Sequence, residues 1–582
     1  MLAYIGPGPG LAVGGPVLAT LVGILAALLA LLTLPVRWFF RRAKPRQPAL
    51  ARRVVVLGLD GLEPTTLERL LGEGRLPQLQ SLHYQRLATT CPPLSPVAWS
   101  TFATGVHPGR HGIFDFIHRD RHDRPYLSFS QVVEGKPRFL RKSKSFWQVL
   151  GEHGVFSHIL RVPVSWPCQP FFGLQLAAMG TPDLRGTQGT YTLFSSRQRA
   201  LAHGQLVRWQ ASGNGLRARL EGPPGEQLEV RLEGRQLVLP GHTVELEPGR
   251  STAWLTVRFR KCTGLARFTL LPENDLYMTP LQLDPARPAA PVSWPASFAP
   301  ALARLHGPFA TCGLAEDTGA CVDEVLSQEA FLEQVYTIEQ ERERQFFHCL
   351  ERTSEGLCLA VFDAPDRVQH VVNDQALVDA LYVHLDAVVG QTLSRLTADD
   401  LLLVLSDHGC GPWRRSFDLN AWLIERGYLV MAGETPDRDQ SRAYGLGLSG
   451  LYLLGPAEGL REELLAVVDP ETGESPLLDV FESSSLYHGP YRDKAPDLVL
   501  AYRPGYRTSR TSAQGQAGQT VFSSNTSAWQ TDHCFHPEHV PGVLLANREL
   551  AGGAHLVDLA STILEALGVP RPDYLEGKSL CV

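Results

Sequence analysis

Three short apolar segments, widely separated in the chain, each lead to an aspartate, and this pattern restricts the possible folds more than any other. The segments are residues 54–59, 357–362 and 401–405. Their runs of Val and Leu without charged side chains predict strands that are buried on both faces of a parallel sheet. Helical patterns at residues 145–152, 328–350 and 375–396 separate them. Alternating strands and helices predict an α/β fold, with a mostly parallel central sheet flanked by helices.

The aspartates that follow these segments predict a common site. Asp60, Asp366 and Asp407 each stand within a few residues of a predicted strand end. The carboxyl ends of parallel strands meet at one edge of a sheet, where α/β proteins bind ligands. A single aspartate after a strand is more often a turn or helix-cap residue. Three of them, each in a patterned context, favour a site.

Three histidines extend the predicted site. His370 follows Asp366 by four residues, His408 follows Asp407 directly, and His533 lies in the segment Thr531-Asp-His-Cys. Neutral imidazole and carboxylate are typical ligands of Zn²⁺. Six such side chains and a hydroxyl exceed what one ion takes, so we expect two divalent ions. Zinc is the expected metal, with Mn²⁺ or Mg²⁺ as alternatives. Two such ions can clamp the attacking and leaving oxygens of a phosphoryl transfer.

Ser95 is the candidate nucleophile, and it would also be a metal ligand. It lies in the segment Pro92-Pro-Leu-Ser-Pro-Val-Ala-Trp-Ser-Thr-Phe-Ala-Thr-Gly. A serine hydroxyl is a poor nucleophile unless a base or a metal activates it. By itself, Ser95-Pro96 would be read as a turn; beside the predicted metal ligands, we interpret the serine as the attacking group.

Taken together, these motifs resemble the alkaline phosphatase superfamily, and within it the type I phosphodiesterase/nucleotide pyrophosphatase branch. Within that branch, the chain resembles a set of bacterial proteins described as predicted phosphohydrolases or phosphomutases. The resemblance runs from about Val54 to the end of the chain, apart from an inserted segment. It implies an alkaline phosphatase-like core and a phospho-serine intermediate that water hydrolyses. It also implies one metal bound by Asp366, His370 and His533, and a second bound by Asp60, Asp407, His408 and the Ser95 oxygen.

The chain departs from this branch at informative positions. Nucleotide pyrophosphatases have a threonine where this chain has Ser95, and an asparagine where Phe116 follows Asp115. The missing asparagine argues against nucleotide pyrophosphatase activity. A sulfatase is excluded, because the motif that starts at Cys91 has a serine where a sulfatase requires arginine. Arg367, between two ligand positions, is a candidate substrate-binding residue, although a second role as a solvated or supporting side chain fits it equally.

The pattern of apolar and polar residues changes between about Tyr191 and Leu283. Residues 216–220, 228–232 and 253–259 alternate apolar and polar side chains, which is typical of half-buried antiparallel strands. We therefore predict four parts of the chain. They are an anchor and linker (1–50), a first catalytic part (51–190), an inserted β-rich subdomain (191–285) and a second catalytic part (286–582).

The amino-terminal segment predicts a membrane anchor. Residues 11–36 carry no charge, and about 20 apolar residues span a bilayer as a helix. Basic residues follow between 37 and 53 rather than preceding the segment, which is unlike a signal peptide. The positive-inside rule then places the catalytic domain in the cytoplasm. These features predict a single-pass cell-membrane protein with a transmembrane helix, and a lipid-linked phosphoester as one class of substrate.

Three functions stay open at this point. The leading one is a metal-dependent phosphoester hydrolase, that is, a phosphodiesterase or phosphohydrolase. The second is a phosphoryl or phosphodiester transferase or phosphomutase, in which an acceptor other than water receives the group from Ser95. The third is a non-catalytic membrane scaffold that binds a partner through the insertion. Nucleic acid is not an expected partner, because the formal net charge is −6 and no basic surplus is present.

Overall fold

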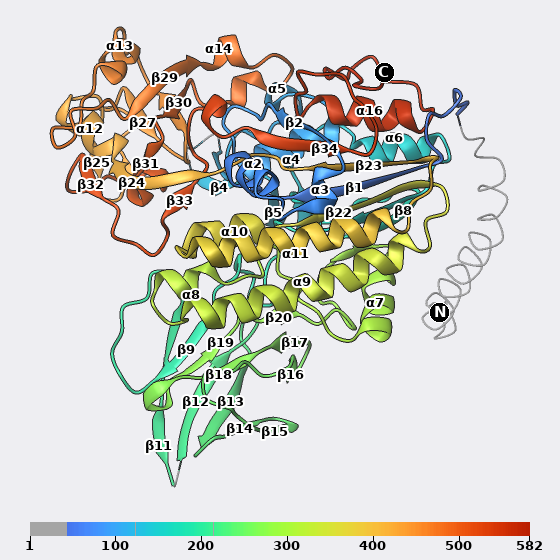
Figure 1. Cartoon of the computed structure of the whole chain (residues 1–582). Coiled ribbons are helices and arrows are strands. Elements are labelled where there is room, and N and C mark those ends of the chain that lie inside the picture. Colours follow the sequence, from blue (N-terminus) through green and yellow to red (C-terminus); the bar gives the residue numbers. More distant parts are fainter. Residues whose placement is uncertain (1–43, 121, 123, 214) are drawn as a thin grey trace, which may run out of the picture.

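A mixed eight-stranded sheet forms the centre of the molecule (Figure 1). The computed structural model describes residues 44–582 except 121, 123 and 214. The strand order is β2 (His83–Leu87), β34 (Gly542–Ala546), β23 (Asp400–Leu405), β1 (Arg53–Leu59), β22 (Gly356–Phe362), β7 (Ser157–Leu160), β8 (Gly173–Leu176) and β21 (Ser293–Trp294). Strands β23 to β8 pair in parallel, and the outer strands are antiparallel to their neighbours. The predicted α/β fold is confirmed.

The three predicted buried strands are neighbours in the middle of this sheet. β1 lies between β23 and β22, so that Val54 is opposite both Leu401 and Leu357. Successive side chains of β1 enter two different hydrophobic cores, with Val55 in one and Val56 in the other. Because helices cover both faces, these strands show apolar runs rather than alternation.

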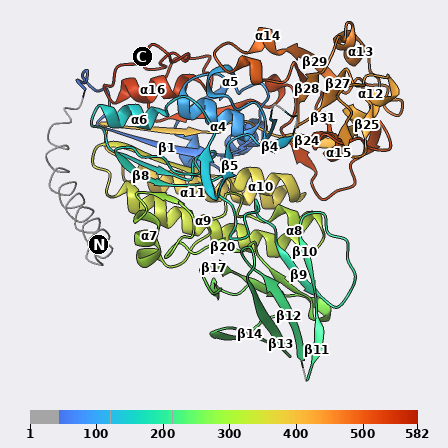
Figure 2. The same cartoon turned by 180° about the vertical axis from the view of Figure 1, so that it is seen from behind.

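Helices lie on both faces of the sheet (Figures 1 and 2). α9 (Gln328–Leu350), α10 (Ala364–Val371) and α11 (Gln375–Leu393) contribute to one core, whereas α4 (Ser95–Thr104), α6 (Phe146–Glu152) and α16 (Asp558–Ala566) contribute to the other. α4 has a proline in its first turn and ends at Gly105, whose φ is 63°, which is the usual asymmetry of helix ends. Its first residue is the candidate nucleophile.

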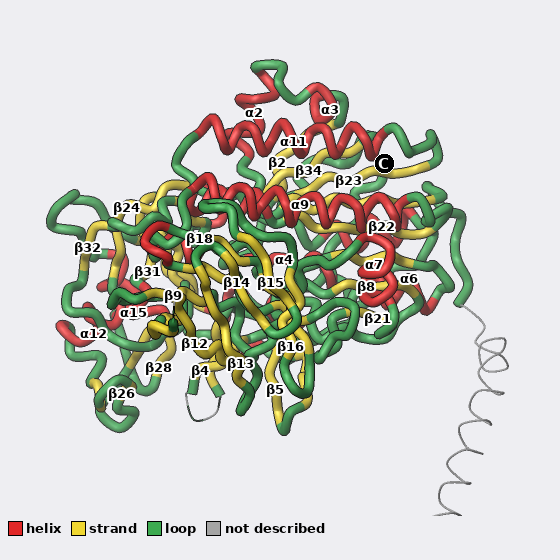
Figure 3. The backbone as a smooth tube through the Cα atoms, turned by 90° about the horizontal axis from the view of Figure 1, so that it is seen from below, coloured by secondary structure: helices red, strands yellow, loops and turns green. Residues whose placement is uncertain are grey.

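Antiparallel strands project from the α9 side of the sheet (Figures 1 and 3). Five of them form one sheet, in the order β11 (Gln210–Ser212), β12 (Gly215–Glu221), β13 (Gln227–Glu233), β14 (Gln236–Leu239) and β15 (His242–Glu245). Buried and exposed residues alternate along β13. Leu220 and Val230 of these strands belong to the same hydrophobic cluster as Phe331 and Val335 of α9. The buried side chains of these strands thus belong to a hydrophobic cluster that continues into the catalytic fold.

Residues 411–540 build a further region with a separate hydrophobic cluster. β24 (Gly411–Phe417) pairs with β31 (Gly505–Thr508), β32 (Phe522–Ser524) and β33 (Thr531–Asp532). The cluster includes Phe417, Trp422, Tyr444, Leu500 and Phe535. This region supplies His533, directly after β33, to the candidate site.

The predicted membrane anchor, residues 11–36, lies outside the described residues. Across the part of the chain that the structure describes, no helix combines the length and the apolar character needed to cross a membrane. This finding corrects the prediction of a single-pass cell-membrane protein with its catalytic domain in the cytoplasm, and that prediction is not carried further.

Candidate active site

The three predicted aspartates come together at the carboxyl edge of the central strands. Asp60 directly follows β1, Asp407 follows β23 by two residues, and Asp366 lies in the first turn of α10 after β22. The backbone N–H of Asp366 donates to the carbonyl of Asp60 at 3.0 Å. All three carboxylates are buried, with at most 8% of each residue exposed. Parallel register alone therefore places acids that are more than 300 residues apart in the sequence in one site.

The predicted ligands Asp366, His370 and His533 form a first group. Each residue offers one ligand atom, and these atoms lie within 4.8 Å of one another. His370 Nε2 is 3.1 Å from Asp366 Oδ1, and His533 Nε2 is 3.8 Å from the same oxygen. Asp366 and His370 are four residues apart on α10 and so share a helix face, while His533 arrives from residues 411–540.

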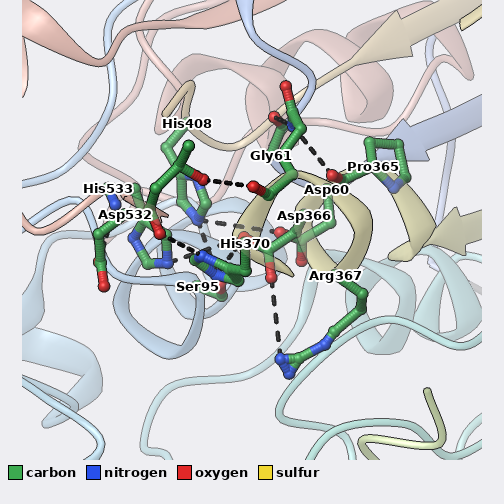
Figure 4. A network of polar contacts seen from close by, with 12 residues as sticks. Asp60, Gly61, Ser95, Pro365, Asp366, Arg367, His370, His408, Asp532 and His533 are labelled. Carbon is green, nitrogen blue, oxygen red and sulfur yellow. Dashed lines mark hydrogen bonds and ion pairs between the residues drawn. The ribbon is translucent and has the colours of Figure 1, made fainter. Parts of the chain in front are cut away.

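A second group consists of Asp60, Asp407 and His408, again with ligand atoms within 4.8 Å of one another. His408 Nε2 lies 3.3 Å from Asp407 Oδ2 and 3.8 Å from Asp60 Oδ1. Ser95 Oγ is 3.1 Å from the same imidazole nitrogen. The two groups are adjacent, because the rings of His408 and His533 stack with their centroids 3.8 Å apart (Figure 4).

Each of the three histidines directs Nε2 into the site. Nδ1 of His370 is 2.8 Å from the Thr531 carbonyl, and Nδ1 of His533 is 2.7 Å from the Pro93 carbonyl. Nδ1 of His408 is 3.0 Å from the Gly409 carbonyl. A carbonyl only accepts, so Nδ1 carries the proton in every case. The lone pair of each neutral ring is then on Nε2, which is the arrangement of a metal-binding histidine.

Three carboxylate oxygens in the site have no hydrogen-bond partner among the described residues. They are Asp60 Oδ1, Asp366 Oδ1 and Asp407 Oδ2, and all three are buried. Burial, and then the charges of Asp407 and Asp366, raise the pKa of Asp60 well above its usual range. Burial and the charge of Asp366 likewise raise the pKa of Asp407 to about 8. Buried carboxylates without partners are costly unless a cation compensates them, so the donor set fits divalent metal ions.

The pKa values of Asp366, His408 and His533 are lowered, whereas those of Asp60 and Asp407 are raised. Burial alone would raise the pKa of Asp366, but the imidazoles of His370 and His533 outweigh it and hold that pKa well below its usual range. Burial lowers the pKa of His533, and it lowers the pKa of His408 well below the usual value. These directions favour neutral rings at His408 and His533 and an ionised Asp366, which are the protonation states that metal binding requires.

Several contacts fix the second group and the nucleophile. Trp99, one turn after Ser95 on α4, donates its indole N–H to Asp60 Oδ2 at 2.7 Å. Trp99 is not among the predicted site residues, although it lies within the serine motif. The N–H of Gly61 lies 3.3 Å from Asp407 Oδ1. Only the oxygens that point toward the histidines are thus left without a donor.

Arg367, the predicted substrate-binding residue, lies beside Asp366. Its Nη1 atom is 3.9 Å from Asp366 Oδ2, and its buried Nε atom has no hydrogen-bond partner. In Figure 4 the side chain approaches Asp366 from the side opposite His408 and His533. The structure places its charge next to a ligand; a role in substrate binding stays a prediction.

Asp115 precedes Phe116, where the sequence differs from that of nucleotide pyrophosphatases, and its carboxylate has a structural role. Its carboxylate accepts hydrogen bonds from the N–H groups of Phe116 at 2.6 Å, Leu448 at 2.8 Å and Ser449 at 3.2 Å. Burial raises its pKa to about 6. Asp115 therefore joins the segment after α5 (Pro108–His111) to residues 411–540, and it is not one of the clustered ligands.

The chain matches a known protein family. The model of a family described as type I phosphodiesterase/nucleotide pyrophosphatase matches residues 54–179 and 289–531. The unmatched residues 180–288 contain the projecting strands. No significantly similar sequence was found among curated proteins.

Three of the solved structures that match this chain are as follows. Murine ectonucleotide pyrophosphatase/phosphodiesterase 5, as an inactive variant in complex with AMP, is 11% identical, with coverage of 90% of this chain and 97% of that chain and a TM-score of 0.42. Phosphonoacetate hydrolase from Sinorhizobium meliloti 1021 is 13% identical, with coverage of 90% and 100% and a TM-score of 0.43. Alkaline phosphatase PafA is 13% identical, with coverage of 93% and 99% and a TM-score of 0.44.

Proposed function

We propose that this chain, which belongs to the type I phosphodiesterase/nucleotide pyrophosphatase family of the alkaline phosphatase superfamily, hydrolyses a phosphate ester with Ser95 as its nucleophile. Enzymes of this superfamily cleave phosphate esters and use divalent metal ions. The observation that carries the proposal is the position of Ser95 Oγ, 3.1 Å from His408 Nε2, beside two groups of ligands that contain three unpartnered carboxylate oxygens.

The ligand set supports two divalent ions, and we propose zinc, with Mn²⁺ or Mg²⁺ as alternatives. Asp366, His370 and His533 would hold one ion. Asp60, Asp407, His408 and the Ser95 oxygen would hold the other. When bound, such ions stabilise negative charge on phosphate oxygens and lower the pKa of a neighbouring hydroxyl. The mixture of imidazole and carboxylate donors favours zinc over magnesium, which prefers oxygen ligands alone.

The protein's own groups define the covalent step. Ser95 Oγ forms a bond to phosphorus while the bond from phosphorus to the ester oxygen breaks. The serine proton is lost, and the leaving oxygen takes up a proton. Water then attacks the phospho-serine, which releases the phosphate product and restores the hydroxyl. Ser95 is the first residue of the ten-residue helix α4, so the positive end of the helix dipole lies where negative charge develops.

The histidine network keeps this site in one geometry. The carbonyl of Pro93, two residues before the nucleophile, is bonded to His533 Nδ1 at 2.7 Å. The ring of His408, beside the serine oxygen, stacks on His533. The serine loop is therefore held against both ligand groups, and positioning of this kind contributes a large part of phosphoryl-transfer catalysis.

Metal analysis and a matched pair of serine variants test the proposal. The purified full chain is assayed for metal content and for hydrolysis of bis-p-nitrophenyl phosphate and p-nitrophenyl phosphate. We expect about two divalent ions per chain and a loss of activity of about 10³-fold or more in Ser95→Ala. Ser100→Ala is the control, because Ser100 lies on the same helix and its buried hydroxyl has no hydrogen-bond partner. No bound metal, or equal activity in Ser95→Ala, would contradict the proposal.

A further inference from the structure

Gln369 lies on α10 between the ligands Asp366 and His370, and its side chain is buried against the other half of the site. The amide nitrogen Nε2 donates to the carbonyl of Gly61 at 2.7 Å and to that of Pro365 at 2.9 Å. The residue is 6% exposed. Gly61 directly follows Asp60, a ligand of the second group. A side chain of the first group's helix therefore holds the backbone of the second group's loop.

Tyr382 on α11 fixes the orientation of this amide. Its hydroxyl donates to Gln369 Oε1 at 3.0 Å and accepts from the N–H of Glu63 at 2.8 Å. Because Oε1 takes the hydroxyl proton, Nε2 must face the two carbonyls, and no flipped amide satisfies the same partners. Tyr382 is completely buried, so these hydrogen bonds have no competition from water.

The backbone of the loop after β1 has little conformational freedom at Gly61, whose carbonyl accepts the hydrogen bond from Gln369. Gly61 has a φ of 68°, and a Cβ atom there would lie 2.8 Å from the Cβ of Asp366. The N–H of Gly61 faces Asp407 Oδ1 at 3.3 Å, and the carbonyl of Asp60 accepts from the N–H of Asp366. Segments that carry ligands of both groups thus meet at a single glycine.

We infer that Gln369 and Tyr382 are positioning residues that couple the two halves of the metal site, so that the two ions bind cooperatively. The inference rests on the proposed two-metal function. Asp366 and His370 would hold the first ion, and this would fix the first turn of α10 and with it the Gln369 amide. That amide holds Gly61, so it would keep Asp60 and Asp407 aligned. The ligands of the second group would then already be ordered when a second ion binds, which is the condition for positive cooperativity.

Zinc titration of the metal-free full chain, followed by competition with a chromophoric chelator, tests the coupling. Wild type should take up two ions in one steep transition. Gln369→Met keeps the length of the side chain but removes its donors and acceptor. We expect it to weaken zinc binding by about 10- to 100-fold, the usual cost of losing a supporting hydrogen bond at a metal site, and to split the transition into two. Tyr382→Phe should cause a smaller loss. The double variant should resemble Gln369→Met, because both changes break the same contact.

The chain offers a matched control pair. Gln334 and Tyr277 are also buried, and Gln334 Nε2 lies 3.2 Å from the Tyr277 hydroxyl. Their side-chain hydrogen bonds within the described residues run to each other and to Asp317, and not to the predicted ligands of the two groups. Gln334→Met and Tyr277→Phe should lower thermal stability and leave the steep two-ion transition unchanged. If Gln369→Met fails to fold, Tyr382→Phe, which removes a single hydroxyl, carries the test.

The outcomes separate this inference from the function on which it rests. Wild-type binding of two ions together with an unchanged transition in Gln369→Met and Tyr382→Phe overturns the coupling and leaves the proposed function standing. An equal loss of steepness in Gln334→Met also overturns it, because the effect would then be general loosening. A wild-type chain that binds no divalent ion overturns both.

Discussion

The two ligand groups of the candidate site are assembled in different ways. Asp60, Asp407 and His408 come from the ends of β1 and β23, which are adjacent parallel strands. Asp366 and His370 come from one helix, but their partner His533 comes from residues 411–540, a region with its own hydrophobic cluster. The position of the second group is therefore set by the sheet register, whereas the first group depends on how a separate region packs against the catalytic fold.

Because of this difference, the position of His533 can change while the central sheet stays the same. Polar contacts hold residues 411–540 against the catalytic fold, among them His533 Nδ1 to the Pro93 carbonyl and the Asp115 carboxylate to the N–H groups of Leu448 and Ser449. A change in these contacts moves His533 but leaves Asp60 and Asp407 in register. We expect the first group to be the more sensitive of the two.

Removal of the metals should have the largest effect, because it affects both groups together. Chelation leaves three buried carboxylates without compensating charge, so we expect activity to fall by about 10³-fold or more and the melting temperature to fall with it. Activity and thermal unfolding are measured before chelation, after chelation and after zinc is restored. Full activity in the chelated protein would show that neither group holds a catalytic ion.

Substitution of a predicted ligand of the first group tests that group by itself. His533→Ala removes a ligand that depends on residues 411–540, and we expect metal content to fall from about two ions to about one and activity to fall by about 10²-fold or more. His536→Ala is the control, since its ring contacts Phe481 and its own loop and His536 is not one of the clustered residues. Retention of both ions in His533→Ala would show that His533 is not a ligand.

The sequence predicts the sheet-based part of this site well. Residues 54–59, 357–362 and 401–405 coincide with β1, β22 and β23 to within one residue, and residues 328–350 are α9. Local patterns suffice there, because apolar runs and strand-end acids are read from consecutive residues. The predicted boundaries of the insertion, 191–285, stay a proposal.

Contacts between distant segments could not be predicted in the same way. Three contacts join residues that no local sequence pattern relates. They are the hydrogen bond from Trp99 to Asp60, the hydrogen bond from Gln369 to the Gly61 carbonyl, and the pairing of β24 with β31. The separate cluster of residues 411–540 was missed for the same reason. Its strands are short and pair across up to about a hundred residues, and no repeat or spacing marks such pairs.

The contact through Asp115 should make the stability of the fold depend on pH. Its folded pKa of about 6 lies above the value of about 3.9 for an unfolded aspartate. Its contribution is therefore complete below about pH 4 and is lost as the pH rises through about 6, a change of about 2–3 kcal/mol. Urea unfolding of wild type and Asp115→Asn at pH 4 and pH 7 measures it. The free energy of unfolding of wild type should fall more over this range than that of the variant; equal slopes would contradict the prediction.

The smallest effect we expect concerns the sheet-based group. Trp99→Phe removes the indole N–H that donates to Asp60 Oδ2 at 2.7 Å, in a helix position that is completely buried. The lost hydrogen bond and the small cavity should cost about 1–3 kcal/mol in the free energy of unfolding. Zinc affinity should fall by about tenfold, because Asp60 loses the contact that orients it. Trp422→Phe, in the buried core of residues 411–540, should cost similar stability without changing zinc affinity. A fall in affinity in both variants would mean that the sheet-based ligands depend on the surrounding fold as much as His533 does.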